Sequence, residues 1–355
     1  NNNNFKKSRF WKYNIEPDYH QKESTIIENL YNLIGRSVEQ RLANSDVDVG
    51  VFLSGGLDSS IITYFASKFN KNIDTFSLGF DDNSIDESKY SDYISSKFNT
   101  NHHKLNFNLK NASDLQNKLF KKIYEPLSDS SMLSYYLLSE FASKKVKVVL
   151  GGDASDEIFG GYSTFIANKI LNFLPLKLLN KSNNNIKNFL TLIPASNKNM
   201  SLNFKLNNFF KFDFSNKNIA NQVWLSPNSL NEVNKIFGRN YSYDEIYYES
   251  ISEWENSSNL DIIDKSLEFY FNFFLKNQIL TKTDRLSMLN SLEVRSPFLD
   301  YDLVDFVRKL PNKFKINLFR GKYILKKTFQ NIFGKKFVNR KKIGFTSPLS
   351  KMISD

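Results

Sequence analysis

The segment Ser54-Gly55-Gly56-Leu57-Asp58-Ser59-Ser60 carries residue types that bind phosphate groups. It follows an apolar run, Val47–Leu53, that is typical of a buried strand, and a helix is expected to begin at the serines. Two glycines permit a tight turn and a close backbone approach, so free N–H groups and the positive helix end face outward. The serine hydroxyls add further donors. We therefore interpret this turn as an anion site.

Two details narrow the chemistry of this turn. It contains no lysine, so it differs from the GxxxxGK[ST] loop that binds phosphates for γ-phosphoryl transfer. Asp58 would repel a bare anion, but it would fit beside pyrophosphate if its carboxylate held Mg²⁺. The plain structural alternative is a strand-to-helix turn in which Asp58 and the serines only cap the helix.

The elements that must position this turn alternate between strand and helix. Apolar spacing predicts helices over 24–42, 59–69, 87–98 and 130–143. It predicts strands over 47–53, 73–80, 102–109 and 146–150. This alternation predicts an α/β fold with a doubly wound parallel sheet, in which ligands bind beyond the carboxyl ends of the strands. The turn after Leu53 and the pair Gly151-Gly152 after Leu150 both lie at such ends.

Beyond Tyr162 the pattern changes to a mostly helical one. Ser266–Leu292 and Leu299–Leu310 have helical spacing, and Phe165–Phe214 is interpreted as helices and loops. We expect this half to pack against the sheet as a lid.

Composition excludes several classes of protein. The 355 residues include no cysteine and three histidines, which excludes thiolate zinc sites and cysteine nucleophiles and disfavours a Ser/His/Asp triad. The absence of cysteine fits a cytoplasmic location. No apolar window is long enough to span a membrane, so no membrane partner is expected. The net charge of +11 is spread along the chain, which favours a solvated basic face with a polyphosphate site over a nucleic-acid groove.

Four blocks, in the family's order, resemble the asparagine synthetase family within the N-type ATP pyrophosphatases, whose sheet is of the adenine nucleotide alpha hydrolase type. Ser54–Ser60 resembles the pyrophosphate loop, and Gly151–Tyr162 resembles the family's second signature. Leu280–Arg285 with Leu292–Asp300 resembles its third block, and Arg340–Phe345 resembles its late basic motif. Four ordered blocks are far more specific than a single loop.

The resemblance implies ATP and Mg²⁺ as cofactors and assigns residues to them. Asp58 and Asp156 would hold Mg²⁺, as hard oxygen ligands from two strand ends. The residues implied in ATP binding are Leu53, Ser54, Gly55, Gly56, Leu57, Asp58, Ser59, Ser60, Leu78, Gly151 and Gly152.

Three residues are implied as catalytic. Asp153 lies where the family usually has a Glu important for forming the acyl-adenylate, and its shorter side chain puts the identity of the substrate in doubt. Lys342 matches the late lysine, and Arg285 matches a cationic position of the third block. In-line attack on the α-phosphorus needs such positive charge where the pentavalent centre and pyrophosphate develop.

The resemblance also implies a domain organisation. We expect residues 1–23 to be a linker from a missing glutaminase domain, residues 24–350 to be the synthetase domain, and residues 351–355 to be a truncated end. Within the domain, the sheet core is expected at about 24–162 and the helical part at about 163–350. A glutaminase domain in cis or in trans would then supply ammonia, and a homodimer is among the assemblies left open.

The favoured activity is ATP-dependent amide formation, with aspartate converted to asparagine as the default reaction. A related alternative is amidation of another acid, such as a sugar acid of a surface polysaccharide, which the residue at Asp153 keeps open. Two other classes remain: a tRNA-modifying pyrophosphatase, which the basic charge favours, and a nucleotide-binding module without catalysis, which Asp58 and Asp156 oppose.

Overall fold

The computed structural model describes residue 8, residues 10–82, 84–107, 112–125, 127–174, 202–211, 216–257 and 260–341, and residue 347. Its centre is a parallel sheet of five strands in the order β3-β2-β1-β4-β5. The strands are β1 (Val49–Phe52), β2 (Asp74–Phe80), β3 (Asn101–Phe107), β4 (Val148–Leu150) and β5 (Glu293–Arg295). The predicted doubly wound parallel sheet is confirmed.

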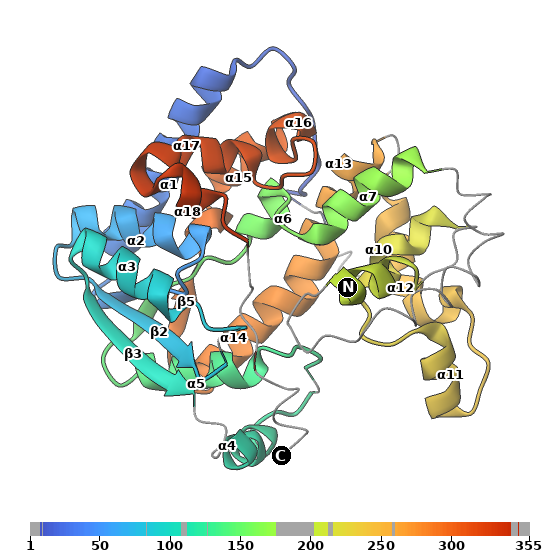
Figure 1. The fold of residues 1–355 in the computed structure, drawn as a ribbon, viewed down its shortest axis with the longest axis horizontal. Helices are drawn as coiled ribbons and strands as arrows, with labels where there is room; N and C mark the ends of the chain where they lie inside the picture. The colour runs from blue at the N-terminus through green and yellow to red at the C-terminus, as the bar shows by residue number, and fades with distance from the viewer. Residues whose placement is uncertain are drawn as a thin grey trace, which may run out of the picture.

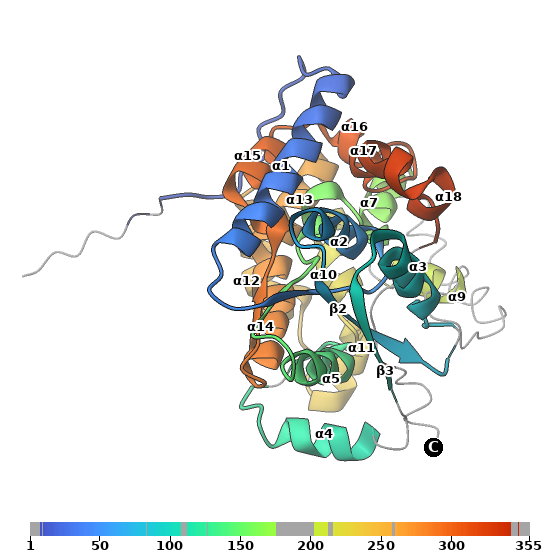
Figure 2. The ribbon, with the colours of Figure 1, turned by 90° about the vertical axis from the view of Figure 1, so that its left-hand side faces the viewer.

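Helices cover both faces of this sheet (Figure 1). One face packs against α1 (Glu23–Ala43), α2 (Leu57–Phe69) and α17 (Tyr323–Phe333), and the other against α5 (Met132–Ala142) and α14 (Thr281–Met288). Successive strand residues point to opposite faces, so Val51 belongs to the first core and Phe52 to the second. In Figure 2, α1 and α17 lie on one side of the sheet and α5 on the other.

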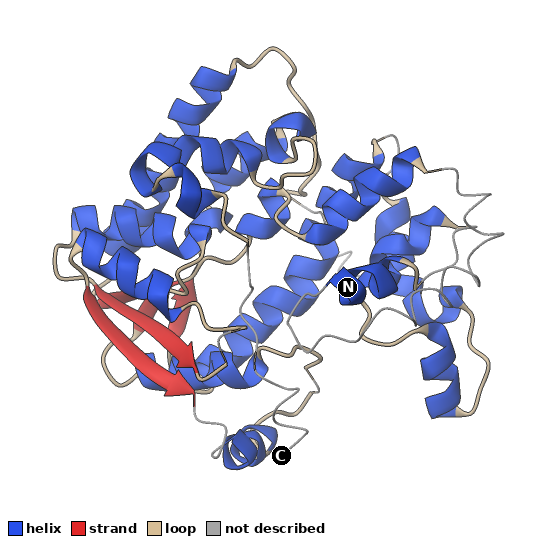
Figure 3. Ribbon diagram, in the orientation of Figure 1, coloured by secondary structure: helices blue, strands red, loops and turns tan. Residues whose placement is uncertain are grey.

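The remaining elements are mostly helical, as expected for the C-terminal half. Figure 3 shows that the strands occupy one side of the molecule, while the other side contains helices and loops. These helices are α7 (Ser163–Phe173), α9 (Leu202–Phe209), η2 (Lys217–Ile219), α10 (Ala220–Leu225), α11 (Leu230–Phe237), α12 (Tyr243–Glu255) and α13 (Ile262–Phe269). The helices elsewhere in the molecule that have not yet been named are α3 (Ser88–Phe98), α4 (Ala112–Phe120), α6 (Ser155–Phe159), η4 (Pro297–Leu299), α15 (Tyr301–Arg308), α16 (Asn312–Lys315) and α18 (Lys335–Val338).

Local sequence signals set several helix starts. Ser229 and Ser242 each form a capping box with the glutamate three residues later, and Asp261 and Asp300 accept hydrogen bonds from the first turns of α13 and α15. The predicted helix over 266–292 is one helical run with an internal π-helix, η3 (Tyr270–Leu280).

The sheet differs from the expectation in one strand. The sheet core is expected at about residues 24–162, but β5 comes from the C-terminal half and pairs with β4, with Leu150 opposite Arg295. Just after β5, the Ser296 hydroxyl donates to the Asp153 carbonyl oxygen at 2.7 Å. The C-terminal half therefore supplies an edge strand that also holds the turn after β4.

The N-terminal segment before α1 is packed against the helical part. Tyr13 is fully buried and stacks on Phe271 with ring centroids 4.0 Å apart, and the Ile15 amide donates to Glu268 at 3.1 Å. Among the described residues, no helix is long and apolar enough to cross a membrane.

Candidate active site

The turn between β1 and α2 is held open by glycine geometry. Gly55 has φ +78°, and a Cβ atom there would lie 2.7 Å from the Ser91 amide nitrogen and 2.8 Å from the Tyr90 Cβ. Inside the turn, the Gly56 amide donates to the Ser54 hydroxyl at 3.2 Å, and the Ser60 hydroxyl donates to the Gly56 carbonyl at 2.6 Å. A larger residue at position 55 would force the turn away from α3.

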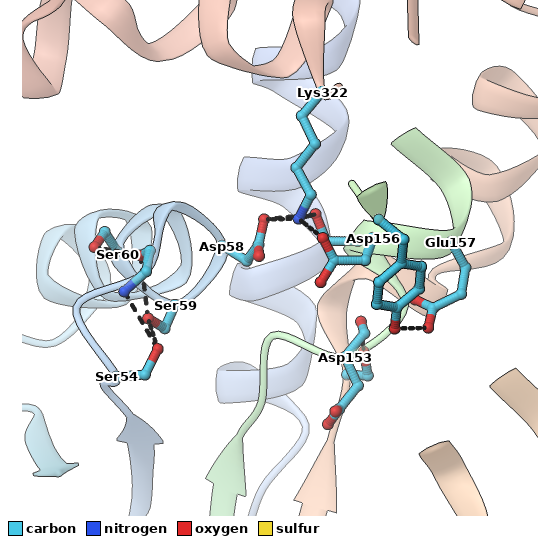
Figure 4. A network of polar contacts seen from close by, with 12 residues as sticks. Ser54, Asp58, Ser59, Ser60, Asp153, Asp156, Glu157 and Lys322 are labelled. Carbon is cyan, nitrogen blue, oxygen red and sulfur yellow. Dashed lines mark hydrogen bonds and ion pairs between the residues drawn. The ribbon is translucent and has the colours of Figure 1, made fainter. Parts of the chain in front are cut away.

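This turn presents donors rather than acceptors. The first turn of a helix leaves N–H groups without helix partners, and Gly56, the residue before α2, has no side chain to cover them. The Ser54 and Ser59 hydroxyls lie 3.1 Å apart beside these groups (Figure 4). The combination of a helix dipole, free N–H groups and hydroxyls makes an anion site.

The turn after β4 lies directly against the first turn. β1 and β4 are neighbours in the sheet, and the chain continues from them in opposite directions, so the crevice between them is the topological switch point. A Cβ on Gly152 would lie 3.2 Å from the Asp58 Cβ and 3.4 Å from the Ser59 amide nitrogen. The Ser155 hydroxyl donates to Asp58 at 2.7 Å. The two predicted turns therefore form one site.

Asp58 and Asp156 converge on a single cation, the ammonium of Lys322. Its Nζ lies 2.6 Å from the Asp58 Oδ1 and 2.8 Å from the Asp156 Oδ1, and Lys322 is 5% exposed (Figure 4). Burial by itself lowers the pKa of Lys322, but Asp156 and Asp58 outweigh this and leave the pKa above its ordinary value. The ammonium is therefore charged and bridges the carboxylates.

The backbone around this bridge leaves room for it at two glycines. A Cβ on Gly161 would lie 1.8 Å from the Asp156 Oδ1 and 2.4 Å from the Lys322 Cε. A Cβ on Gly321 would lie 2.2 Å from the Gly160 carbonyl oxygen. Lys322 itself has φ +55°, and its amide donates to the Phe159 carbonyl at 3.1 Å, which fixes α17 against α6. The bridge is thus enforced by close backbone packing.

A second polar cluster lies beside Asp153. Lys282 donates to Asp129 and to the Ser131 hydroxyl, both at 3.0 Å, and is 8% exposed. Burial raises the pKa of the Asp153 carboxyl, and the charge of Lys282 opposes this rise only in part. For Asp129, burial also favours the neutral form, but Lys282 and Ser131 hold its pKa below the ordinary value.

Comparison with known proteins shows which family the chain belongs to. The family model described as asparagine synthase matches residues 29–354. This chain belongs to the asparagine synthase family. The match covers nearly the whole chain and includes all four blocks that resembled the family.

Individual relatives agree with this assignment. The chain is 27% identical over 346 residues to "Asparagine synthetase [glutamine-hydrolyzing] 1" of Bacillus subtilis, covering 96% of this chain and 52% of the relative. It is 28% identical over 352 residues to "Asparagine synthetase [glutamine-hydrolyzing] 3" of the same organism, covering 94% and 50%. The enzyme of the same name from Arabidopsis thaliana is 31% identical over 147 residues, covering 38% and 25%. The chain thus spans about half the length of the Bacillus relatives.

Most of the residues that the family resemblance singled out lie around this crevice. Ser54 to Ser60 form the first turn, and Gly151, Gly152, Asp153 and Asp156 form the second. Leu53 follows β1, where its amide donates to the Phe76 carbonyl at 2.8 Å, and Leu78 lies in β2; both are buried. Leu57 opens α2 and is partly buried. Their roles in binding remain predictions.

Of the two predicted catalytic cations, Arg285 is among the described residues and pairs away from the two turns. Arg285 forms an ion pair with Glu125 at 2.5 Å, and its side chain is 40% exposed. No contact between Arg285 and the two turns occurs within the described part of the chain. Lys282, one helical turn earlier on α14, is the buried cation beside Asp153 instead. Lys342 lies outside the described residues.

Sequence reasoning missed three lysines of this site: Lys282, Lys322 and Lys326. Lys326 lies in the first turn of α17, four residues after Lys322, and is half-buried. Burial first, and then the charges of Lys322 and Arg320, lower the pKa of Lys326. The one local signal was Gly321-Lys322 ahead of a helix, because a glycine there allows another backbone segment to approach closely.

Proposed function

We propose that this chain activates the carboxylate of an acid with ATP and then transfers the acyl group to ammonia. A carboxylate oxygen would attack the α-phosphorus, and the bond from this phosphorus to the oxygen leading to the β-phosphate would break. An acyl-adenylate and pyrophosphate would result. Ammonia would then attack the acyl carbon, AMP would leave, and a proton released from the nitrogen would yield a neutral amide. Aspartate to asparagine is the default substrate and product.

One observation carries this proposal: the donor-rich turn at Ser54–Ser60 directly adjoins a pair of carboxylates that already share one cation. An anion site alone would fit any phosphate ligand. The convergence of Asp58 and Asp156 adds a hard-oxygen ligand pair beside it, which is what a nucleotide bound with Mg²⁺ requires. When bound, Mg²⁺ would neutralise charge on the phosphate oxygens.

The remaining residues have roles that their geometry supports. The N–H groups at the start of α2 and the hydroxyls of Ser54 and Ser59 would bind the β- and γ-phosphates. Lys322 and Lys326 would offset the charge of departing pyrophosphate. Asp153 belongs to the second turn and feels the charge of Lys282, and the acid would be bound near these two residues.

The source of ammonia is a proposal of its own. The Bacillus relatives are named as glutamine-hydrolysing, and this chain spans about half of their length. We propose that ammonia derived from glutamine by a glutaminase domain, in cis or in trans, reaches this site. The chain studied alone should then accept ammonium chloride and fail to use glutamine.

The test is exchange of labelled pyrophosphate into ATP, measured with a panel of acids at fixed Mg²⁺. Aspartate-dependent exchange is expected in the wild-type chain, and a sugar acid serves as the alternative substrate. Asp58→Asn keeps the shape of the side chain and should reduce exchange at least a hundredfold, since it removes a proposed Mg²⁺ ligand. Glu39→Gln, an exposed change on α1, is the matched control. No exchange with any acid in folded wild-type chain would refute the proposal.

A further inference from the structure

Arg340 connects the phosphate-binding turn to the end of the chain's helical part. One guanidinium nitrogen donates to the Gly55 carbonyl oxygen at 2.7 Å, across 285 positions of sequence. A second nitrogen forms an ion pair with Glu87, and the guanidinium carbon lies 4.0 Å from the centre of the Tyr90 ring. We call these four residues, Arg340, Gly55, Glu87 and Tyr90, the Arg340 clasp.

The ion pair of the clasp is largely buried. The side chains of Arg340 and Glu87 are 13% and 12% exposed. Tyr90 is also the residue that faces Gly55, because a Cβ on Gly55 would lie 2.8 Å from the Tyr90 Cβ. The same short stretch of chain, the start of α3, therefore limits the turn sterically and supports the arginine that holds it.

The hydrogen bond to Gly55 fixes the orientation of one peptide group. In a trans peptide the carbonyl of one residue and the N–H of the next point in opposite directions. With the Gly55 carbonyl directed to Arg340, the Gly56 N–H points back into the turn, where it meets the Ser54 hydroxyl at 3.2 Å. A flip of this peptide would place a carbonyl oxygen inside the anion site and repel a phosphate.

Glycine at position 55 makes such a flip easy, because a residue without Cβ moves freely between the conformations that the two orientations need. A turn of this composition therefore needs an external restraint. Arginine is suited to this because its planar fork can serve a carbonyl and a carboxylate together while its face stacks on an aromatic ring. A lysine has one ammonium group and cannot occupy all three places.

We infer that Arg340 is a positioning residue for the nucleotide: it does not bind the phosphates, but it fixes the Gly55–Gly56 peptide in the orientation that does. This inference rests on the proposed function of the Ser54–Ser60 turn. Two of the guanidinium nitrogens are committed to Gly55 and Glu87, so the residue acts through the backbone of the turn. Glu87 and Tyr90 keep it in place.

The experiment compares Arg340→Met and Arg340→Lys with Lys336→Met in the 355-residue chain. Lys336 is exposed on α18, so its substitution removes the same charge nearby without touching the clasp. Binding of Mg-ATP is measured by titration calorimetry, and exchange of backbone amide hydrogens is followed over residues 54–60. Arg340→Met should weaken ATP binding about tenfold to a hundredfold and speed amide exchange in the turn. Arg340→Lys should restore neither the ATP affinity nor the amide protection of the turn. Lys336→Met should match the wild type in both measurements.

Several outcomes overturn the inference. Wild-type ATP affinity and wild-type amide protection of the turn in folded Arg340→Met would do so, as would full rescue by Arg340→Lys. A lower melting temperature with unchanged ATP affinity in the folded fraction would give Arg340 a purely structural role, and this outcome would also overturn the inference. If Arg340→Met does not fold, Tyr90→Leu, which removes the ring that stacks on the guanidinium, is used in its place. Tyr90→Leu should weaken ATP binding in the same way but by a smaller factor. Unchanged ATP affinity in Tyr90→Leu would refute the inference.

The amide-exchange measurement can be made whether or not the chain has enzymatic activity. If the wild-type chain shows no ATP binding and no pyrophosphate exchange, the proposed function fails while the effect of Arg340 on the turn is still decided. If the wild-type chain binds ATP and exchanges pyrophosphate, and the Arg340 variants match it in ATP affinity and amide exchange, the proposed function stands and the inference fails.

Discussion

The Nζ of Lys322 lies 2.6 Å from the Asp58 Oδ1, although the two residues are 264 positions apart. Asp58 lies in the first turn of α2 at one side of the crevice, and Lys322 precedes α17, which belongs to the C-terminal part of the chain. With Asp156 as the third member, this bridge ties the two turns of the site to the helical part (Figure 4).

Lys322→Met should lower stability, because it leaves two largely buried carboxylates without their cation. We expect the free energy of unfolding to fall by about 3 kcal/mol, in the range found when one partner of a buried pair is removed. Lys327→Met is the matched control, since Lys327 lies on the same helix but pairs with Glu23 at a more exposed position. Its loss should stay below about 1 kcal/mol. Denaturant titration measures both, and equal losses would contradict the assigned importance of the bridge.

Gly161→Ala should damage the site by steric overlap. The added Cβ would lie 1.8 Å from the Asp156 Oδ1, so the Asp156–Lys322 pair must move. We expect pyrophosphate exchange to fall at least tenfold and stability to fall by about 1–3 kcal/mol. Gly238→Ala is the control: that glycine has φ +63° and open space around it, so alanine there should cost about 1 kcal/mol and leave exchange unchanged. Unimpaired exchange in Gly161→Ala would show that the pair is not needed in its present position.

Lys326→Met should weaken ATP binding without a large loss of stability. In the described part of the chain Lys326 makes no ion pair or side-chain hydrogen bond, yet it follows Lys322 by four residues and feels the charges of Asp58 and Asp156. A lysine that has no partner among the described residues and lies next to an anion site is available for phosphate oxygens, so its loss should raise the KM for ATP by roughly tenfold. Steady-state kinetics measures this, with Lys327→Met as the control on the other face. An unchanged KM would remove Lys326 from the site.

Glu157→Gln should change the pH dependence of stability. Glu157 is 1% exposed, and burial together with the neighbouring Asp156 raises the pKa of its carboxyl to about 7, while the Tyr162 hydroxyl donates to it at 2.6 Å. Because the pKa in the folded chain is above the unfolded value, the favourable contribution of the protonated group is complete below about pH 4.5. It is lost as the pH rises through 7.

Glutamine does not titrate, so Glu157→Gln should gain stability relative to the wild type across that window. The gain should approach the order of 3 kcal/mol by pH 8. Chemical denaturation at a series of pH values measures the difference, and Glu39→Gln, an exposed change, should show none. A difference between Glu157→Gln and wild type that does not vary from pH 4.5 to pH 8 would show that Glu157 is ionised throughout.

The fold and the first turn could be predicted from local sequence. The strand before Ser54, the glycines and the hydroxyls lie within about a dozen positions, and the hydrogen bonds of the turn join residues at most five positions apart. The strands β1, β2 and β3 also have clear apolar or alternating patterns. In contrast, β5 has three residues and no pattern of its own; it is a strand because β4 offers it an unpaired edge.

The lysines show what local pattern could not decide. Arg285 and Lys282 differ by three positions on one helix, and only the packing of α14 against α5 determines that Lys282 is the one buried beside Asp129. Lys322 and Arg340 likewise resemble surface charges in sequence. A charge becomes part of a site when burial removes its water and places carboxylates or carbonyls within hydrogen-bond distance.

The sequence by itself determined the first four strands of the sheet and the donor-rich turn, because helix and strand periods and glycine conformations depend on residues close together in the chain. The tertiary structure decided which cations complete the site. Their partners are contributed by elements more than a hundred residues away, and no local preference specifies which distant charges will face each other once water is excluded from between them.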